Sequence, residues 1–336
     1  MTSIQSYADD PLWLPHQFNA GAREVTLVKL PRSRFAQAEF LANHKASAGD
    51  EARISLNDFT GAKVEAGPFH FIFHTAFCRS TLLVRALNIP GHSVGLSEPG
   101  VLANLAGQAA QSGKADGAMI AASTAWLGRL QSDSKAVFIK PTNHANALMP
   151  AMMQANPDAR AVLMSNSLHD FLSAVNRRGL LGREWARKLY LEVGRYAPLD
   201  LGLDGAAQFA LSDMQVAGIA WLLQRRWMLM VMEHVGQGRF VSLDSAVFND
   251  NRAASLAAVT KACGVPLSVA DAEKAASSNV FTAHAKLGGD FQTRESEQAT
   301  RSTSAIWEEE AAQVAQWIGI IAGQAGIPET LPNAVI

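Results

Sequence analysis

A short polar loop between two apolar segments is the first place where residue types suggest chemistry. The β-favouring run 69–73 is followed by loop 75–79 and by Ser80 and Thr81, which open a segment with apolar residues at helical spacing. A strand, a tight loop and a helix N-terminus build an anion site, because the first N–H groups of the helix and the positive end of its dipole converge there. Arg79 adds a guanidinium that can bind a sulfuryl or phosphoryl group.

Other polar side chains follow further apolar runs. Glu98 follows the extended segment 93–97, and Lys140 follows the strand expected at 136–139. These short strands alternate with helices and are apolar throughout, which indicates a parallel sheet covered by helices on both faces. Ligands of such sheets bind beyond the carboxyl ends of the strands, so we expect the loop, Glu98 and Lys140 to converge there.

The remaining segments predict elements around this sheet. The N-terminal part predicts a strand at 25–30 and a helix at 34–44, without a catalytic signature. Further strands are expected at 161–164 and 240–243. Helices are expected at 81–87, 101–110, 148–154, 210–235, 252–263 and 304–323, and Ser304 would cap the last of them. The segment 277–303 is expected to be a polar surface loop.

Composition excludes several classes of protein. The 336 residues carry 29 Lys and Arg against 30 Asp and Glu, so no global field attracts nucleic acid or an anionic membrane. Two cysteines, Cys78 and Cys263, are too few for a disulfide framework or a Cys-type zinc site. The apolar stretch 216–235 is interrupted by charged residues, and the N-terminus lacks a secretory pattern. We therefore expect a cytoplasmic protein that binds neither nucleic acid nor membranes.

The loop and the segments after it resemble a known family. The run 71–87 contains Ser-Thr-Leu-Leu at 80–83 and resembles the phosphosulfate loop of the sulfotransferases, bacterial and tyrosylprotein sulfotransferase-like members among them. Glu98 stands where such enzymes place a catalytic base. Lys140-Pro141, the Asn-Pro-Asp-Ala segment 156–159, Ser173 and Arg177 are found at matching intervals, and 281–286 is similar to a second nucleotide-contact region.

The resemblance implies site residues and a donor, 3′-phosphoadenosine 5′-phosphosulfate. Arg79 and Glu98 would be catalytic, with Glu98 as general base and Lys140 or Lys286 adding charge for the leaving phosphate. The nucleotide-binding residues would be Phe77, Cys78, Arg79, Ser80, Thr81, Ser173, Arg177 and Lys286. No metal is required by this scheme.

Three departures from the family pattern concern the same site. Phe77 stands where the family has Arg or Lys, and Arg79 stands where it has Gly. Ser165 replaces the Arg that binds the 3′-phosphate in the family, a charge that Arg177, Arg178 or Lys286 could replace. With Arg79 in place of glycine, a side chain stands where the family's loop backbone approaches the phosphate closely.

Together these observations predict an α/β protein with a three-layer parallel sheet of the P-loop nucleoside triphosphate hydrolase and sulfotransferase type, with helical insertions. We expect residues 1–67 to form an N-terminal extension packed on a sulfotransferase-like P-loop domain, 68–336. The expected function is sulfuryl transfer to a hydroxyl or amine of a small-molecule acceptor; acceptor and oligomeric state stay open.

Alternatives remain at this point. A P-loop kinase or nucleoside triphosphatase would use magnesium and an acidic strand-end residue such as Asp244. A non-catalytic, degenerate P-loop domain would only bind an anion. Individual residues also have structural interpretations: Ser80 and Thr81 as helix caps, Glu98 as a first-turn carboxylate, and His74 as an ordinary buried histidine.

Overall fold

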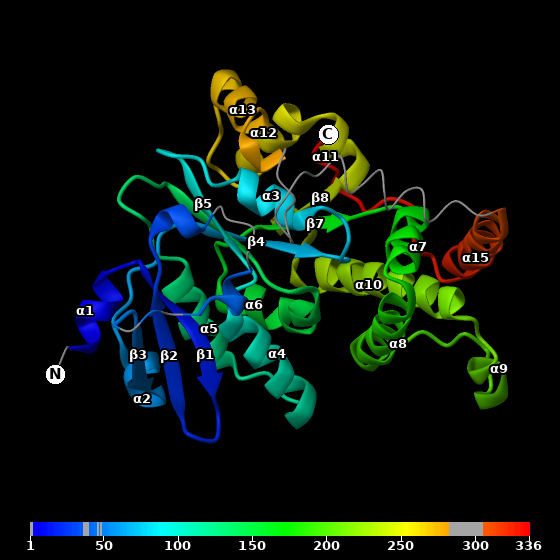
Figure 1. The fold of residues 1–336 in the computed structure, drawn as a ribbon, viewed down its shortest axis with the longest axis horizontal. Coiled ribbons are helices and arrows are strands. Elements are labelled where there is room, and N and C mark those ends of the chain that lie inside the picture. The colour runs from blue at the N-terminus through cyan, green and yellow to red at the C-terminus, as the bar shows by residue number, and fades with distance from the viewer. Residues whose placement is uncertain (1–2, 36–39, 46, 48, 282–304) are drawn as a thin grey trace.

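A parallel sheet lies at the centre of the computed structural model, which describes residues 3–35, 40–45, 47, 49–281 and 305–336 (Figure 1). Its strand order is β5-β6-β4-β7-β8, so the first of these strands in the chain is the middle one. The five strands are β4 (Phe69–His74), β5 (Ser93–Ser97), β6 (Ala136–Lys140), β7 (Ala161–Ser165) and β8 (Phe240–Asp244). All four pairings are parallel, which brings the carboxyl ends of the strands to one edge.

Both faces of this sheet are buried, which explains the continuous apolar runs. Along β4, Phe71 and Phe73 belong to the core on one face, and Ile72 belongs to the core on the other. The first core includes residues of α4 (Gly100–Ser112), α5 (Gly117–Leu127), α6 (Met149–Ala155) and α10 (Asp213–Val235). The second includes residues of α3 (Ser80–Ala86), α11 (Ser245–Asp250), α12 (Arg252–Ala262) and α13 (Val269–Ala276). The prediction of a three-layer α/β fold is confirmed.

A helical region extends from the sheet beyond β7 (Figure 1). It consists of α7 (Leu168–Arg177), α8 (Gly179–Tyr196), the short α9 (Gly205–Phe209), the N-terminal half of α10 and α15 (Ala305–Gln324). Of these helices, α7, α8, α10 and α15 share a separate apolar core that includes Phe171, Leu189, Trp221 and Val314. Because α7 begins directly after β7, this region borders the carboxyl edge of the sheet.

The N-terminal residues form an antiparallel sheet, β1-β2-β3, that shares a core with the parallel sheet. Its elements are α1 (Ile4–Asp9), β1 (Trp13–Asn19), β2 (Glu24–Lys29), β3 (Glu51–Ser55) and α2 (Leu56–Gly61). The helix expected at 34–44 is wrong for the described residues there, which form only the 3-10 turns η1 (Arg32–Arg34) and η2 (Leu41–Asn43). Phe35, directly after η1, and Leu41, in η2, are both buried, so each of these turns places an apolar side chain in the core.

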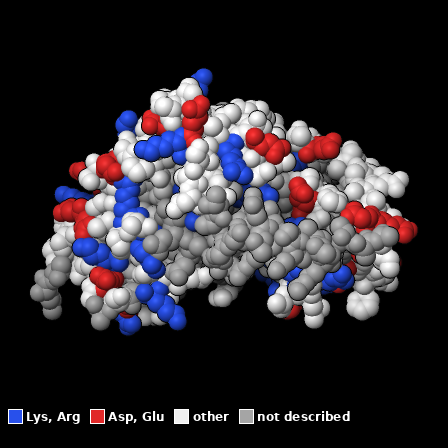
Figure 2. Space-filling view, turned by 45° about the horizontal axis from the view of Figure 1, so that its top comes forward, with Lys and Arg blue, Asp and Glu red and all other residues white. Residues whose placement is uncertain are grey.

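The remaining 3-10 turns are η3 (Asn143–Leu148), η4 (Gln237–Arg239) and η5 (Asn279–Phe281). Lys286, Ser304 and nearly all of the surface loop expected at 277–303 lie outside the described residues. Within the part of the chain that is described, no helix is long and apolar enough to cross a membrane. Basic and acidic side chains lie side by side over the described part of the face in Figure 2.

Candidate active site

The loop after β4 has the backbone of a glycine-rich loop without its glycines. Ala76, Phe77 and Arg79 have φ values of 67°, 55° and 62°, in the left-handed region. Each such residue costs on the order of 1–3 kcal/mol and persists only where its surroundings impose it. Left-handed residues in a turn direct successive N–H groups toward a common concavity that binds anions. The structure thus retains the conformation that the missing glycine at position 79 would have supplied.

Neighbouring strand ends hold the loop in this conformation. The Thr75 N–H donates to the Met164 carbonyl at 3.1 Å, and the Thr75 hydroxyl donates to Asn166 Oδ1 at 3.1 Å. His74 is buried, accepts the Ala76 N–H at Nδ1 and contacts the Pro141 carbonyl through Nε2 at 3.1 Å. These contacts assign the proton to Nε2 and give His74 a structural role, as a neutral histidine that shapes the loop.

Four residues of the loop and of the first turn of α3 lie wholly or partly under the surface. Ser80 and Thr81, the first residues of α3, are buried, and Arg79 is half-buried. Cys78 is fully buried, its thiol donates to the Met164 carbonyl, and burial raises the pKa of this thiol. Cys78 therefore fills space below the loop and contributes no reactive thiolate there.

Glu98 and Lys140 meet at the ends of β5 and β6. Lys140 Nζ lies 2.6 Å from Glu98 Oε1, and the ammonium is fully buried while 19 % of the Glu98 side chain is exposed. Burial lowers the pKa of Lys140, against the opposing effects of Glu98 and of Cys78 in the loop. The carboxylate thus reaches solvent beside the loop, with its position fixed by a buried cation.

The N-terminal region also contacts the main chain of Glu98 and the side chain of Lys140. The Ala42 N–H donates to the Glu98 carbonyl at 3.0 Å, and Lys140 Nζ lies 5.7 Å from the centre of the Phe40 ring. Glu98 itself has a φ of 50°, a strained backbone at the point where strand β5 gives way to α4. Residues 1–67 carry no functional signal in their sequence, and η2 nevertheless forms part of the site's wall.

A second acid–base pair lies nearby and was missed by sequence analysis. His144 Nδ1, from η3, lies 2.6 Å from Glu192 Oε2, from α8. The hydrogen bond to Glu192 raises the pKa of His144, and the charge of Glu98 raises it further. The two residues are 48 positions apart, so no local pattern connects them; only the position of His144 four residues after Lys140 hinted at this edge.

Phe77 joins the loop to the helical region. Its ring centre lies 5.6 Å from that of Phe171 and 4.8 Å from that of Trp185. The guanidinium carbon of Arg178 lies 4.0 Å from the centre of the same ring. Arg177, the predicted nucleotide-binding residue, is exposed in the last turn of α7.

The end of β7 carries a buried guanidinium that comes from elsewhere in the chain. Arg225 Nη1, from α10, lies 3.4 Å from the Ser165 hydroxyl, and Nη2 donates to the carbonyls of Pro328 and Glu329. Burial lowers the pKa of Arg225 to about 10, and nearby Asp244 opposes this effect. Within the described residues, Arg225 Nε has no hydrogen-bond partner. Ser173, on α7, is buried.

Several groups of this site have the chemistry that the expected donor, 3′-phosphoadenosine 5′-phosphosulfate, would need. The left-handed loop and the start of α3 suit a phosphosulfate group, and Ser165 with Arg225 places hydroxyl and guanidinium donors beyond β7. Among the described residues, no group of three His, Cys, Asp or Glu side chains is arranged to hold a metal ion.

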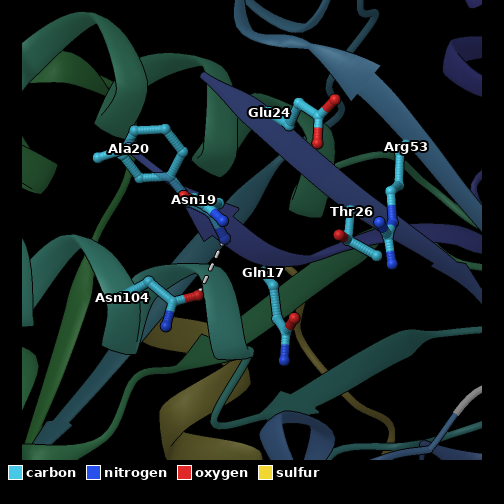
Figure 3. A pocket seen from close by; sticks show the side chains of 8 residues that line it. Gln17, Asn19, Ala20, Glu24, Thr26, Arg53 and Asn104 are labelled. Carbon is cyan, nitrogen blue, oxygen red and sulfur yellow. Dashed lines mark hydrogen bonds between the residues drawn. The ribbon is translucent and has the colours of Figure 1, made fainter. Parts of the chain in front are cut away.

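A polar hollow of about 400 Å³ lies elsewhere, on the N-terminal sheet (Figure 3). Its lining includes Glu24, Thr26 and Arg53, and the Phe18 N–H donates to Asn104 Oδ1 at its side. None of the predicted site residues lines it.

Similarity of this chain to known proteins is seen at the level of structure. No family model and no curated protein sequence matches the chain. Solved structures similar to it include the sulfotransferase domain from the curacin biosynthetic pathway (13% identity, 76% of this chain, 98% of that chain, TM-score 0.42) and a sulfotransferase from Alicyclobacillus acidocaldarius (14%, 76%, 97% and 0.40). Both neighbours are sulfotransferases, the family that the loop resembles. Their TM-scores are below 0.5, so the functional argument rests on the site itself.

Proposed function

We propose that this protein is a sulfotransferase that moves a sulfuryl group from 3′-phosphoadenosine 5′-phosphosulfate to a hydroxyl or amine acceptor. The observation that carries the proposal is the convergence, at one sheet edge, of a left-handed anion loop and a partly exposed carboxylate on a buried ammonium. Sulfuryl transfer needs a cradle for the anion and a base for the acceptor proton. The loop and Glu98 supply these two parts.

Each residue of the site has a separate part in the proposed transfer. The donor supplies an electrophilic sulfur and a phosphate leaving group. Arg79 and the N–H groups at the start of α3 bind the anion. Glu98 accepts the proton of the acceptor hydroxyl. As it does so, the oxygen of that hydroxyl bonds to sulfur, and the bond from sulfur to the phosphate oxygen breaks. Lys140 keeps the Glu98 carboxylate in place, because its ammonium donates a hydrogen bond to Oε1 at 2.6 Å. This scheme assigns no step to a metal.

The kinase alternative has less support from the described residues. The carboxylate of Asp244 accepts the Ala246 N–H at 2.7 Å and the Val247 N–H at 3.4 Å, so it caps α11. A carboxylate used in this way has less capacity to orient magnesium-bound water.

Calorimetry with adenosine 3′,5′-bisphosphate tests the proposal. We expect binding to the wild type, clear weakening in Arg79→Ala and unchanged binding in Glu98→Gln. With labelled donor and a panel of hydroxyl and amine acceptors, Glu98→Gln should lower transfer by about 10²- to 10⁴-fold, the range for loss of a general base. Absence of binding at millimolar nucleotide would overturn the proposed donor. Full transfer by Glu98→Gln would overturn the proposed base.

A further inference from the structure

The loop lacks its own cation at Phe77, and the structure brings one to that side chain from the junction of α7 and α8. We infer that Arg178 supplies a second positive charge, at the uncharged position 77, and binds the anion together with Arg79. This inference rests on the proposed function, because it concerns the same loop. It adds a binding residue from an element about a hundred positions further along the chain.

The Phe77 ring is a fixed support for this charge. Phe171 and Trp185 pack against it at 5.6 and 4.8 Å between ring centres. The guanidinium carbon of Arg178 lies 4.0 Å from the ring centre, well inside the range of cation–π contacts. Stacking on a ring leaves the N–H donors at the edge of a guanidinium available to an oxyanion.

The main chain of Arg178 is equally well placed. Its N–H donates to the carbonyls at the end of α7, and Gly179, with a φ of 58°, turns the chain into α8. The junction therefore holds the start of the Arg178 side chain beside the loop. A lysine or arginine at position 77 would instead be held by the loop itself.

Arg178 differs from two arginines of α8, Arg183 and Arg187, which lie close to a carboxylate. Arg187 is paired with Asp213 at 2.6 Å, and Arg183 lies 3.8 Å from the same carboxylate. Within the described part of the chain, the Arg178 side chain makes one hydrogen bond, from Nη1 to the Ala174 carbonyl at 3.1 Å, and no ion pair. A guanidinium has five donors, so Arg178 keeps both its charge and most of its donors for a ligand.

Calorimetric titration of the full-length chain with adenosine 3′,5′-bisphosphate and, separately, with inorganic pyrophosphate tests this inference. Arg178→Ala and Arg178→Gln should each weaken binding of both ligands about tenfold or more, the effect of losing one charge-assisted hydrogen bond. The matched control is Arg183→Ala, which should leave both affinities unchanged. The variant Phe77→Arg combined with Arg178→Ala should recover affinity, because it returns the cation to the loop.

The outcomes separate this inference from the proposed function. If the wild type binds both ligands and Arg178→Gln, with an unchanged melting temperature, binds them equally well, the inference is wrong and the donor proposal stands. If the wild type binds pyrophosphate but not the nucleotide, and Arg178→Gln weakens pyrophosphate binding, the inference stands and the donor is wrong. If the wild type binds neither ligand, both are wrong.

Discussion

Two acid–base pairs border the candidate site, and they differ although their contact distances are equal. Lys140 to Glu98 and His144 to Glu192 both measure 2.6 Å, but the ammonium is fully buried while 42 % of the His144 side chain is exposed. Burial lowers the pKa of Lys140 in spite of its partner, whereas the hydrogen bond to Glu192 raises the pKa of His144. The comparison shows that solvent access, more than contact distance, decides what a pair does to its members.

The largest effect is expected from breaking the buried pair on its acidic side. Glu98→Ala leaves the fully buried Lys140 ammonium without its carboxylate, and we expect a loss of about 3–5 kcal/mol in the free energy of unfolding at pH 7. Urea unfolding monitored by circular dichroism measures it. The loss should shrink as pH rises, because Glu98→Ala removes the two effects by which Glu98 raises the pKa of Lys140; the pKa in the folded variant falls further, and its unfolded chain then binds more protons.

A double variant is the control for this prediction. Glu98→Ala combined with Lys140→Met removes both charges and puts an apolar side chain in the buried space, so it should be more stable than Glu98→Ala alone. Equal stability of the two variants would contradict the idea that an unpaired buried ammonium causes the loss.

A smaller effect is expected when the same pair is broken on its basic side. Lys140→Met leaves Glu98, whose side chain is 19 % exposed and can be hydrated, so we expect a loss of about 1–3 kcal/mol by the same urea titration. A loss larger than that of Glu98→Ala would reverse the order that burial predicts. Transfer activity should fall too, since the carboxylate is no longer held beside the loop.

The smallest effect is expected at the exposed pair, and it should depend on pH. His144 has a raised pKa in the folded state, so its pairing with Glu192 stabilises the protein fully below the unfolded pKa of about 6.5. This stabilisation is lost as pH rises through the folded pKa. Glu192→Gln should therefore cost about 1 kcal/mol or less at pH 5.5 and nothing at pH 9.

Urea titrations of the wild type and Glu192→Gln at both values of pH measure this difference. A destabilisation that is the same at pH 5.5 and pH 9 would mean that packing, and not charge, accounts for the pair. Thermal melting of His144→Gln at the same two values of pH should repeat the pattern of Glu192→Gln, because either variant removes the ion pair.

The parallel sheet could be predicted because its strands are buried on both faces. Runs such as 69–73 and 161–164 are apolar at every position or nearly so, and the alternating helices complete the pattern. The N-terminal region was less accessible to prediction. β1 contains Pro15 and His16 and has an irregular register at that point, so it lacks the alternation that identifies a strand.

The candidate site could be predicted where chemistry lies at strand ends and not where it comes from other elements. Glu98 and Lys140 each follow an apolar strand, so topology alone brings them together. His144 with Glu192 and Ser165 with Arg225 are joined only by the packing of α8 and α10 on this edge. The conformation of Arg79 was also hidden, since its residue type argues against a left-handed backbone.

The left-handed residues of the loop have a consequence for how it meets a ligand. A glycine loop is free to leave its binding conformation, and an anion must restrict that freedom when it binds. Ala76, Phe77 and Arg79 have fewer alternative conformations, and the contacts of Thr75 and His74 select one of them before any ligand arrives. The loop is preorganised, so less conformational entropy is lost on association than in a loop of glycines.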